Sequence, residues 1–200
     1  MRNKLSKFAL AAVLGLALTF TFGCSSDDKG GSSCNINGET VKIGNQTWMA
    51  ENLNCDVNSS RCYNNDPANC AKYGRLYDWE TAMKVCPSGW HLPSEGEWVE
   101  LIRYVENDNG CTLCAGKYLK ATSGWNNNGM DDYGFSALPG GNGFGDNFNY
   151  VGYGGFWWSS SKSANTSGNA YPQLMRDDED EVIGSSGPKS GLCSVRCVKN

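Results

Sequence analysis

A short stretch of the chain concentrates residue types that can perform acid–base, metal-binding or thiol chemistry. Residues 86–98 read CPSGWHLPSEGEW and contain the only histidine of the chain. His91 and Glu95 are four residues apart, which on a helix would place both side chains on one face. A catalytic or metal site built on this pair is therefore the first hypothesis to weigh against a purely structural role.

The local sequence favours the structural role. Pro93 lies between the two residues and holds the backbone before it in an extended conformation. Ser94 and Glu97 fit the S-x-x-E capping box, so the helix is expected to begin after His91. Apolar residues at i, i+3, i+4 and i+7 form one face of this helix. They are Trp98, Leu101, Ile102 and Val105.

His91 therefore lacks the partners that a zinc site needs. Zinc takes three or four protein ligands, and the chain has no second histidine. We expect His91 to be hydrogen-bonded to backbone near a strand end, and Cys86 to be one half of a disulfide.

The first 24 residues have the pattern of an export signal. Arg2, Lys4 and Lys7 precede an apolar stretch over residues 8–22, which is shorter than the roughly 20 residues of a membrane span. The stretch ends at Gly23-Cys24, which resembles a bacterial lipobox. We expect a lipoprotein signal peptide over 1–23 and a tether over 24–37 that starts at an acylated (for example palmitoylated) Cys24.

The remaining nine cysteines fit an oxidising compartment, in which they should be mostly paired. Because nine is odd, at least one is free, or Cys34 in the tether pairs elsewhere. Cys62 and Cys70 enclose a polar loop with a turn at Asp66-Pro67, and a bridge between them is expected. Cys111 and Cys114 lack the βαβ context of a redox C-x-x-C motif, which favours a small structural bridge.

The folded part is expected to be one α+β domain over residues 38–200. A β-hairpin is predicted over 40–49 with its turn at Gly44-Asn45, and a helix over 76–85 that ends before Pro87. Short strands are predicted near 135–138, 156–159, 170–175 and 194–198. The acidic run 177–181 is expected to be a solvated hairpin tip.

Residues 124–158 differ in composition from the rest of the chain. They hold ten glycines, ten aromatics and six asparagines, and they have no lysine or arginine. Aromatic rings supply contact area at low entropic cost, while glycine and asparagine allow irregular loops. Trp157 and the adjacent Trp158 should point to opposite faces of a strand, one in the core and the other more exposed.

Several of these segments together resemble the Fibrobacter succinogenes major paralogous domain family of exported bacterial proteins. The resemblance rests on IGNQTWMAENLN, on the segment from CYNNDPANC to CPSGWHLPSEGEW, on LKATSGWNNNG with DDYGFSALPGG, and on SVRCV. It implies a C-type-lectin-like fold, related to formylglycine-generating enzymes. In that fold two helices pack on a small twisted antiparallel sheet, and a long Gly/Asn/aromatic loop is inserted. No reaction follows from the resemblance.

The resemblance also implies disulfide pairings. A bridge from the first helix to the last strand corresponds to Cys86 and Cys197. Cys55 and Cys193 depart from the family pattern and are expected to form a pair of their own. Disulfides are expected to staple the domain, each contributing about 2–4 kcal/mol.

The function expected from the sequence is non-catalytic binding at the bacterial cell surface through the 124–158 loops. The protein is expected in the cell envelope, as a lipoprotein of the outer membrane or cell surface. The ligand would be a polysaccharide or a surface protein, and membrane attachment would come from the N-terminal lipid. A net charge of −4 with no basic cluster argues against nucleic acid. The candidate ligand-binding residues are Trp125, Asn127, Tyr133, Phe144, Tyr150, Tyr153 and Trp157.

Other functions stay open at this stage. No cofactor is required, but Asp131, Asp132 and Asp146 are candidate calcium ligands, because calcium prefers oxygen donors. One alternative is an enzyme of the formylglycine-generating type, or another cysteine redox enzyme, using Cys193 and a free Cys197. The other alternative is a purely structural envelope protein.

Overall fold

The computed structural model describes residues 34, 38–164 and 166–200 of the 200-residue chain. The predicted signal peptide, Cys24 and nearly all of the tether lie outside these residues. The described helices are α1 (Pro67–Tyr73), α2 (Trp79–Val85), α3 (Glu95–Asn109), α4 (Ala115–Leu119) and the 3-10 turn η1 (Tyr63–Asn65). No helix among the described residues is both long and apolar enough to cross a membrane.

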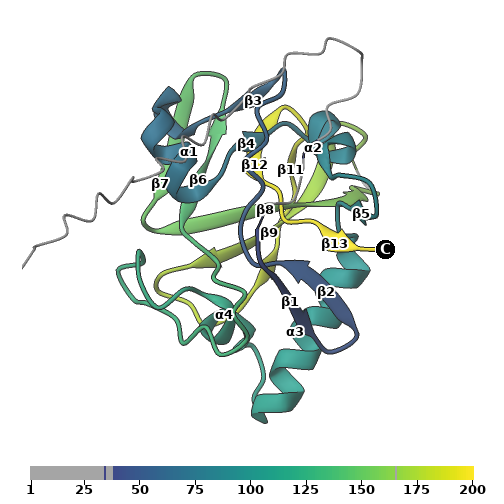
Figure 1. The fold of residues 1–200 in the computed structure, drawn as a ribbon, viewed down its shortest axis with the longest axis vertical. Coiled ribbons are helices and arrows are strands. Elements are labelled where there is room, and N and C mark those ends of the chain that lie inside the picture. The colour runs from purple at the N-terminus through teal and green to yellow at the C-terminus, as the bar shows by residue number, and fades with distance from the viewer. Residues whose placement is uncertain (1–33, 35–37, 165) are drawn as a thin grey trace, which may run out of the picture. The chain divides into compact units, whose positions relative to one another are not determined.

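Two β-sheets complete a mixed α+β architecture (Figure 1). The smaller sheet has the order β1-β2-β13-β5, from β1 (Thr40–Ile43), β2 (Gln46–Met49), β13 (Val198–Lys199) and β5 (Trp90–His91). The larger sheet has the order β10-β9-β8-β6-β12-β4-β3, with β11 beside β9 and β7 beside β6. Its strands are β3 (Ser60–Arg61), β4 (Leu76–Tyr77), β6 (Gly140–Phe144), β7 (Asn147–Val151), β8 (Gly154–Lys162), β9 (Asn169–Arg176), β10 (Ile183–Gly184), β11 (Gly187–Pro188) and β12 (Gly191–Ser194).

The core lies on both faces of β8. Trp157 and Trp158 point to opposite faces, as the alternation along a strand requires, but they are 0% and 1% exposed. Trp157 belongs to an apolar cluster with Trp48 and Trp98, whereas Trp158 belongs to a second cluster with Tyr77. The expectation that one of the two is more exposed is wrong, because apolar side chains cover both faces of this strand.

Helix α3 and the β1–β2 hairpin form where the sequence predicts them. The hairpin turns at Gly44, whose φ of +59° suits glycine. Ser94 caps α3, and the reciprocal capping box with Glu97 is complete. Trp98, Leu101 and Val105 are fully buried.

Other local predictions need correction. Leu76 lies in β4, and α2 begins only at Trp79, because Asp78 accepts the amide hydrogen of Thr81 as N-cap. The domain has two more α-helices than expected among its described residues, α1 and α4. The predicted strand 135–138 makes a single bridge, Lys120 with Ala137. The glycine-rich insertion instead contains the β6–β7 hairpin.

Four disulfides join segments of the described chain. Cys62 with Cys70, Cys86 with Cys197 and Cys111 with Cys114 are the three pairings expected above. The expected Cys55–Cys193 pair is wrong, because Cys55 is bonded to Cys34. Cys34 is 5% exposed and packs in the core cluster of Trp158, against which the partly buried Cys55 also packs. Cys193 is buried and free among the described cysteines.

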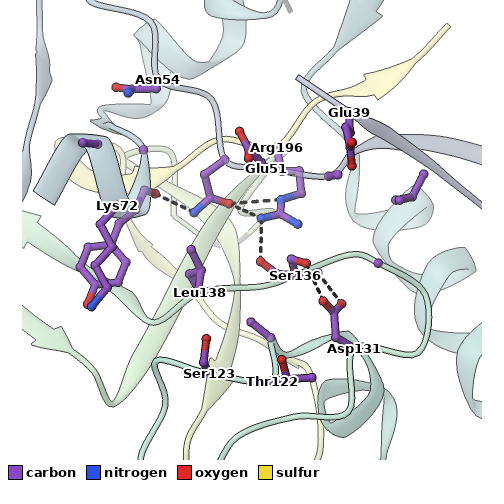
Figure 2. Close-up of a pocket in the computed structure, with 18 of the residues that line it drawn as sticks. Glu39, Glu51, Asn54, Lys72, Thr122, Ser123, Asp131, Ser136, Leu138 and Arg196 are labelled. Carbon is purple, nitrogen blue, oxygen red and sulfur yellow. Dashed lines mark hydrogen bonds between the residues drawn. The ribbon is translucent and has the colours of Figure 1, made fainter. Parts of the chain in front are cut away.

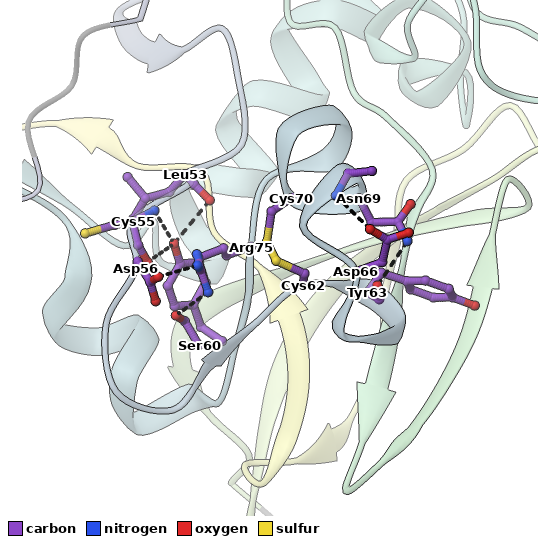
Figure 3. The surroundings of a disulfide bond; sticks show 12 residues. Leu53, Cys55, Asp56, Ser60, Cys62, Tyr63, Asp66, Asn69, Cys70 and Arg75 are labelled. Carbon is purple, nitrogen blue, oxygen red and sulfur yellow. Dashed lines mark hydrogen bonds and ion pairs between the residues drawn. A yellow bond between two sulfur atoms is a disulfide. The ribbon is translucent and has the colours of Figure 1, made fainter. Parts of the chain in front are cut away.

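The Cys62–Cys70 disulfide holds the first turn of α1 against the preceding segment (Figure 3). Asp66 caps the helix by accepting the amide hydrogen of Ala68, and Pro67 occupies the first helical position. Asn69 donates to the Tyr63 carbonyl at 3.0 Å. The sequence signal read as a polar turn is therefore a helix start, and the end of this helix contributes to the site described next.

Candidate functional site

A polar pocket of about 490 Å³ lies between three parts of the domain (Figure 2). One wall is the segment 39–54 around β1 and β2, the second is the end of α1, and the third is the loop 121–138. Its volume falls within the roughly 300–1,000 Å³ that is typical of small-molecule sites. The loop wall overlaps the 124–158 region in which the sequence placed binding.

Asn52 is the centre of the hydrogen-bond network at this pocket. Its side-chain amide donates to the Tyr73 carbonyl at 2.9 Å, which ties the β2 segment to the end of α1. Its oxygen accepts hydrogen bonds from Trp157 Nε1 at 2.8 Å and from Arg196 Nη2 at 2.7 Å. The residue is 9% exposed, so every one of these bonds is sheltered from water.

Gly74 allows this close approach of α1 to Asn52. Its φ is +77°, and a Cβ at this position would lie 2.8 Å from the Cβ of Asn52. Any larger residue would therefore push the end of α1 away from the network and would be strained in this backbone conformation.

Arg196 is a buried cation beside the pocket, with an exposed fraction of 1%. Its guanidinium donates to Asn52 and to the carbonyls of Phe135 and Ser136, and it lies 4.3 Å from the centre of the Phe135 ring. Burial lowers the pKa of Arg196 to about 9, and the nearby charges of Asp131 and Glu51 oppose that shift. The guanidinium stays protonated at neutral pH and fixes the loop 135–136 to Asn52.

Asp131 closes the loop wall from its other end. Its carboxylate accepts hydrogen bonds from the Ser136 amide at 2.6 Å and from the Ser136 hydroxyl at 2.5 Å, as Figure 2 shows. Asp131 and Ser136 both have positive φ, 52° and 49°. Such backbone is costly for residues other than glycine and persists only where surrounding contacts enforce it. Asp131 therefore shapes the wall.

A second set of polar groups lines the pocket without being used by the fold. They are exposed and make no side-chain hydrogen bond to another residue that the structure describes. Glu39 and Glu51 lie across the pocket from Thr122 and Ser123 (Figure 2). The set consists of Glu39, Glu51, Asn54, Thr122 and Ser123. Hydroxyl, amide and carboxylate groups of this kind can hydrogen-bond a polar ligand.

Two of the predicted ligand-binding tryptophans are core residues. Trp125 is 5% exposed and donates to the Ala137 carbonyl at 2.8 Å, and Trp157 is fully buried and donates to Asn52. A ring can stack on a sugar only through an exposed face. The prediction of a ligand contact by these two rings is therefore wrong, because the small domain uses its largest side chains to fill the core.

The other predicted ligand-binding residues do not converge on the pocket. Phe144 is 55% exposed at the tip of the β6–β7 hairpin, while Tyr150 and Tyr153, each 59% exposed, flank the turn before β8. Asn127 is exposed in the 121–138 loop. Tyr133 is half-buried and donates to Asp108 at 2.6 Å.

The three candidate calcium ligands are not brought together. Asp131 binds Ser136, whereas Asp146 at the β6–β7 turn pairs with Arg61 at 2.8 Å, and Asp132 is exposed. Among the described residues there is no cluster of three or more histidine, cysteine or acidic side chains suited to a metal ion. Asp146 is distant from the other two aspartates because it lies in the β6–β7 turn, whereas Asp131 and Asp132 lie in the 121–138 loop.

His91 makes hydrogen bonds to side chains, which corrects the expected backbone bond. Nδ1 lies 2.6 Å from Asn200 Oδ1, and Nε2 lies 2.7 Å from Glu97 Oε1. Burial lowers the pKa of His91, but the hydrogen bonds to Asn200 and Glu97 and the Glu97 charge outweigh it and raise the pKa overall. Glu95 is not a partner, and this arrangement links β5, α3 and the C-terminal residue.

Asn52 and Arg196 are the residues that the sequence-based reasoning missed. Both stand inside segments already singled out, Asn52 in IGNQTWMAENLN and Arg196 in SVRCV. The available signal was a charged residue in the mostly apolar segment SVRCV, which the sequence predicted as a strand but which lies largely between β12 and β13, since an arginine is rarely buried unless its donors are satisfied. Its partners come from 60 and 144 residues away in the chain, so spacing could not identify them.

A comparison with family models supports the resemblance noted from the motifs. The model described as Fibrobacter succinogenes major domain matches residues 41–199. No curated protein and no solved structure matches the chain. The matched range covers both sheets and every wall of the pocket except Glu39.

Proposed function

The chain belongs to the Fibrobacter succinogenes major domain family, and on this premise we propose that it is an exported lipoprotein whose domain binds polysaccharide without catalysis. The observation that carries the proposal is the pocket of about 490 Å³ with its unused hydroxyl, amide and carboxylate groups. These side chains make no hydrogen bond to another described residue, so the described part of the fold does not use them. A polar ligand would satisfy them instead.

Four disulfides are consistent with an exported protein, because such bonds persist in oxidising compartments. The basic residues, apolar stretch and Gly23-Cys24 junction support lipid attachment at the bacterial cell envelope, with the domain at the outer surface. The ligand in that setting is a polysaccharide, and a surface protein is the second candidate.

A C-type-lectin-like fold is part of the same proposal. The mixed α+β architecture, the long insertion between α4 and β8, and the Cys86–Cys197 bridge from α2 to the C-terminal strands support it. In this proposal the insertion supplies one wall of the pocket, and the segment around β1 and β2 and the end of α1 supply the other two.

Thiol chemistry has less support than binding. A reactive Cys193–Cys197 pair would need Cys197 as a free thiol, whereas Cys197 is bonded to Cys86. Burial raises the pKa of the Cys193 thiol, which keeps it protonated and unreactive. Disulfide mapping of the purified protein by mass spectrometry would revive the enzyme hypothesis only if Cys197 were found free.

The direct test is binding of the lipid-free mature protein to a glycan array and to insoluble polysaccharides. Ser123 is exposed and lines the pocket, so Ser123→Trp should obstruct it and weaken binding at least about tenfold, about 1.4 kcal/mol. Ser88→Trp is the matched control, since Ser88 is exposed in the turn before β5 and outside the pocket. Absence of binding to every glycan, or equal binding by Ser123→Trp, would contradict the proposal.

A further inference from the structure

We propose that the pocket selects glycans without acidic groups, which it recognises through hydroxyl hydrogens donated to Glu39 and Glu51. This inference rests on the proposed function and adds to it the chemical class of the ligand. Some charged groups of the pocket are bonded to other residues, and others are exposed to a ligand.

Most N–H donors of Arg196 are already occupied, so the guanidinium cannot form a two-point contact with an acidic ligand, and its charge is shared with the nearby Asp131 and Glu51. A guanidinium has five N–H donors. Four of them are engaged: one on Nε and one on Nη2 with Asn52, one on Nη1 with Phe135, and the second on Nη2 with Ser136. Because Arg196 is 1% exposed, turning it toward an incoming anion would break this network and open the floor of the pocket.

The remaining cation of the pocket is Lys72, near the end of α1. Its ammonium lies 4.8 Å from the centre of the Tyr73 ring, in a cation–π contact with the wall. The side chain is exposed, so water screens its charge. Water screens the exposed Glu39 and Glu51 in the same way, so the balance depends on number: three carboxylates (Glu39, Glu51 and Asp131) line the pocket against two cations, Lys72 and Arg196.

The carboxylates divide into one engaged group and two free ones. Asp131 is occupied by the Ser136 amide and hydroxyl. Glu39 and Glu51 line the pocket and make no side-chain hydrogen bond or ion pair within the described part of the chain. The exposed carboxylates therefore outnumber the single exposed cation, Lys72, in the lining of the pocket.

Carboxylates accept hydrogen bonds and cannot donate them, so a partner for Glu39 and Glu51 must supply hydrogen. Sugar hydroxyls do so, and a hydrogen bond to a charged group is stronger than one between neutral groups. A uronate or sulfate group offers only acceptors and adds like-charge repulsion, which is costly at an interface. Thr122, Ser123 and Asn54 complete the set with groups that both donate and accept.

The experiment compares neutral oligosaccharides with their acidic counterparts on the same lipid-free mature protein by calorimetry. The pairs are manno-oligosaccharides against mannuronate oligomers, and galacto-oligosaccharides against galacturonate oligomers. We expect the neutral member of a bound pair to bind at least tenfold more tightly. The Glu39→Gln/Glu51→Gln double variant should lose affinity for the neutral member about tenfold and bring the two affinities closer together.

Glu100→Gln is the matched control, because Glu100 is exposed on α3 and outside the pocket, and it should change neither affinity. Tighter or equal binding of the acidic members would overturn this inference and leave polysaccharide binding itself intact. Full retention of neutral binding by the double variant would overturn the role of the two glutamates. A protein that binds no member of any pair would overturn this inference, and if it also bound no glycan on the array it would overturn the proposed function as well.

Discussion

At the scale of the residue, the hydrogen bonds of Asn52 hold together the base of the pocket. One side chain accepts from a tryptophan and an arginine and donates to the end of a helix, all in a buried setting. Removing it would leave the guanidinium of Arg196 and the indole of Trp157 without their shared acceptor. Unsatisfied buried donors are costly, and more so when one of them is charged.

We therefore expect Asn52→Ala to lower the free energy of unfolding by about 3 kcal/mol. The measurement is urea denaturation at pH 7, with Asn54→Ala as control, since Asn54 is exposed two residues along the same wall. The control should remain within about 0.5 kcal/mol of the wild type. A small effect of Asn52→Ala would show that the network does not hold the wall.

His91 makes stability depend on pH in a defined direction. Its pKa is raised in the folded state by Asn200 and Glu97 against the opposing effect of burial, so its stabilising contribution is complete below about pH 6.5. That contribution is lost as the pH rises through the raised pKa. For Glu97, burial acts to raise the pKa, but hydrogen bonds to Ser94 and His91 lower it overall. Its contribution is therefore present above the ordinary glutamate value and lost in acid.

The pair should thus stabilise the domain most between about pH 4.5 and 6.5. His91→Gln should be less stable than the wild type in that window and should approach it as the pH rises through the raised pKa of His91. Because His91 is the only histidine, no other imidazole complicates the comparison. Urea unfolding across this pH range measures the difference, and a constant gap between the two proteins at every pH would refute the assignment.

At the scale of the element, the acidic run 177–181 is more than a solvated hairpin tip. It connects β9 to β10, as expected, but Lys120 at the end of α4 reaches into it. The ammonium donates to the carbonyls of Arg176 and Glu179 at 2.8 Å each, and Lys120 is 2% exposed. This contact fixes the start of the 121–138 wall to the larger sheet.

Lys120→Met keeps the aliphatic stem and removes the charge. It should lower the free energy of unfolding by about 2 kcal/mol, because two part-buried hydrogen bonds lose their charged donor and the neighbouring carboxylates lose their counter-charge. Lys117→Met in the same helix is the control, as Lys117 is exposed. Thermal unfolding of both variants measures the effect, and equal stability would rule out an anchoring role.

At the scale of the whole molecule, the disulfides differ in how much unfolded chain they restrict. Cys86 and Cys197 are 111 residues apart, whereas Cys111 and Cys114 are three apart. On the chain-entropy account, the long bridge contributes about 5 kcal/mol and the short one about 2 kcal/mol or less.

The double variant Cys86→Ala/Cys197→Ala should consequently lose far more stability than Cys111→Ala/Cys114→Ala. Denaturation of both proteins under oxidising conditions gives the comparison. Equal losses would mean that the long bridge does not act by restricting the unfolded chain.

Attachment to the membrane is a property of the whole chain and depends on Cys24. Cys24→Ser should move the protein from the membrane fraction to the soluble fraction, with the wild type as control. Membrane retention of the variant would argue against acylation at this position.

Local signals in the sequence determined the parts of the fold that are made by neighbouring residues. The α3 capping box, the β1–β2 turn and the Cys62–Cys70 bridge each depend on residues at most eight positions apart. Backbone hydrogen bonds, turn geometry and apolar periodicity operate over such distances, so spacing alone is informative. The family motifs carry the same kind of information.

The tertiary structure alone decided which side chains are free to act. Tryptophan often contacts ligands, but Trp125 and Trp157 are buried in the core, because the domain packs its largest rings between its layers. Cys55 pairs with Cys34, and both lie against the core cluster of Trp158, a proximity that composition cannot indicate. Residues distant in the chain decide whether a side chain is buried and what it bonds to. Only the assembled pocket therefore shows that Arg196 is hydrogen-bonded to Asn52, whereas the side chain of Glu51 has no hydrogen-bond partner among the described residues.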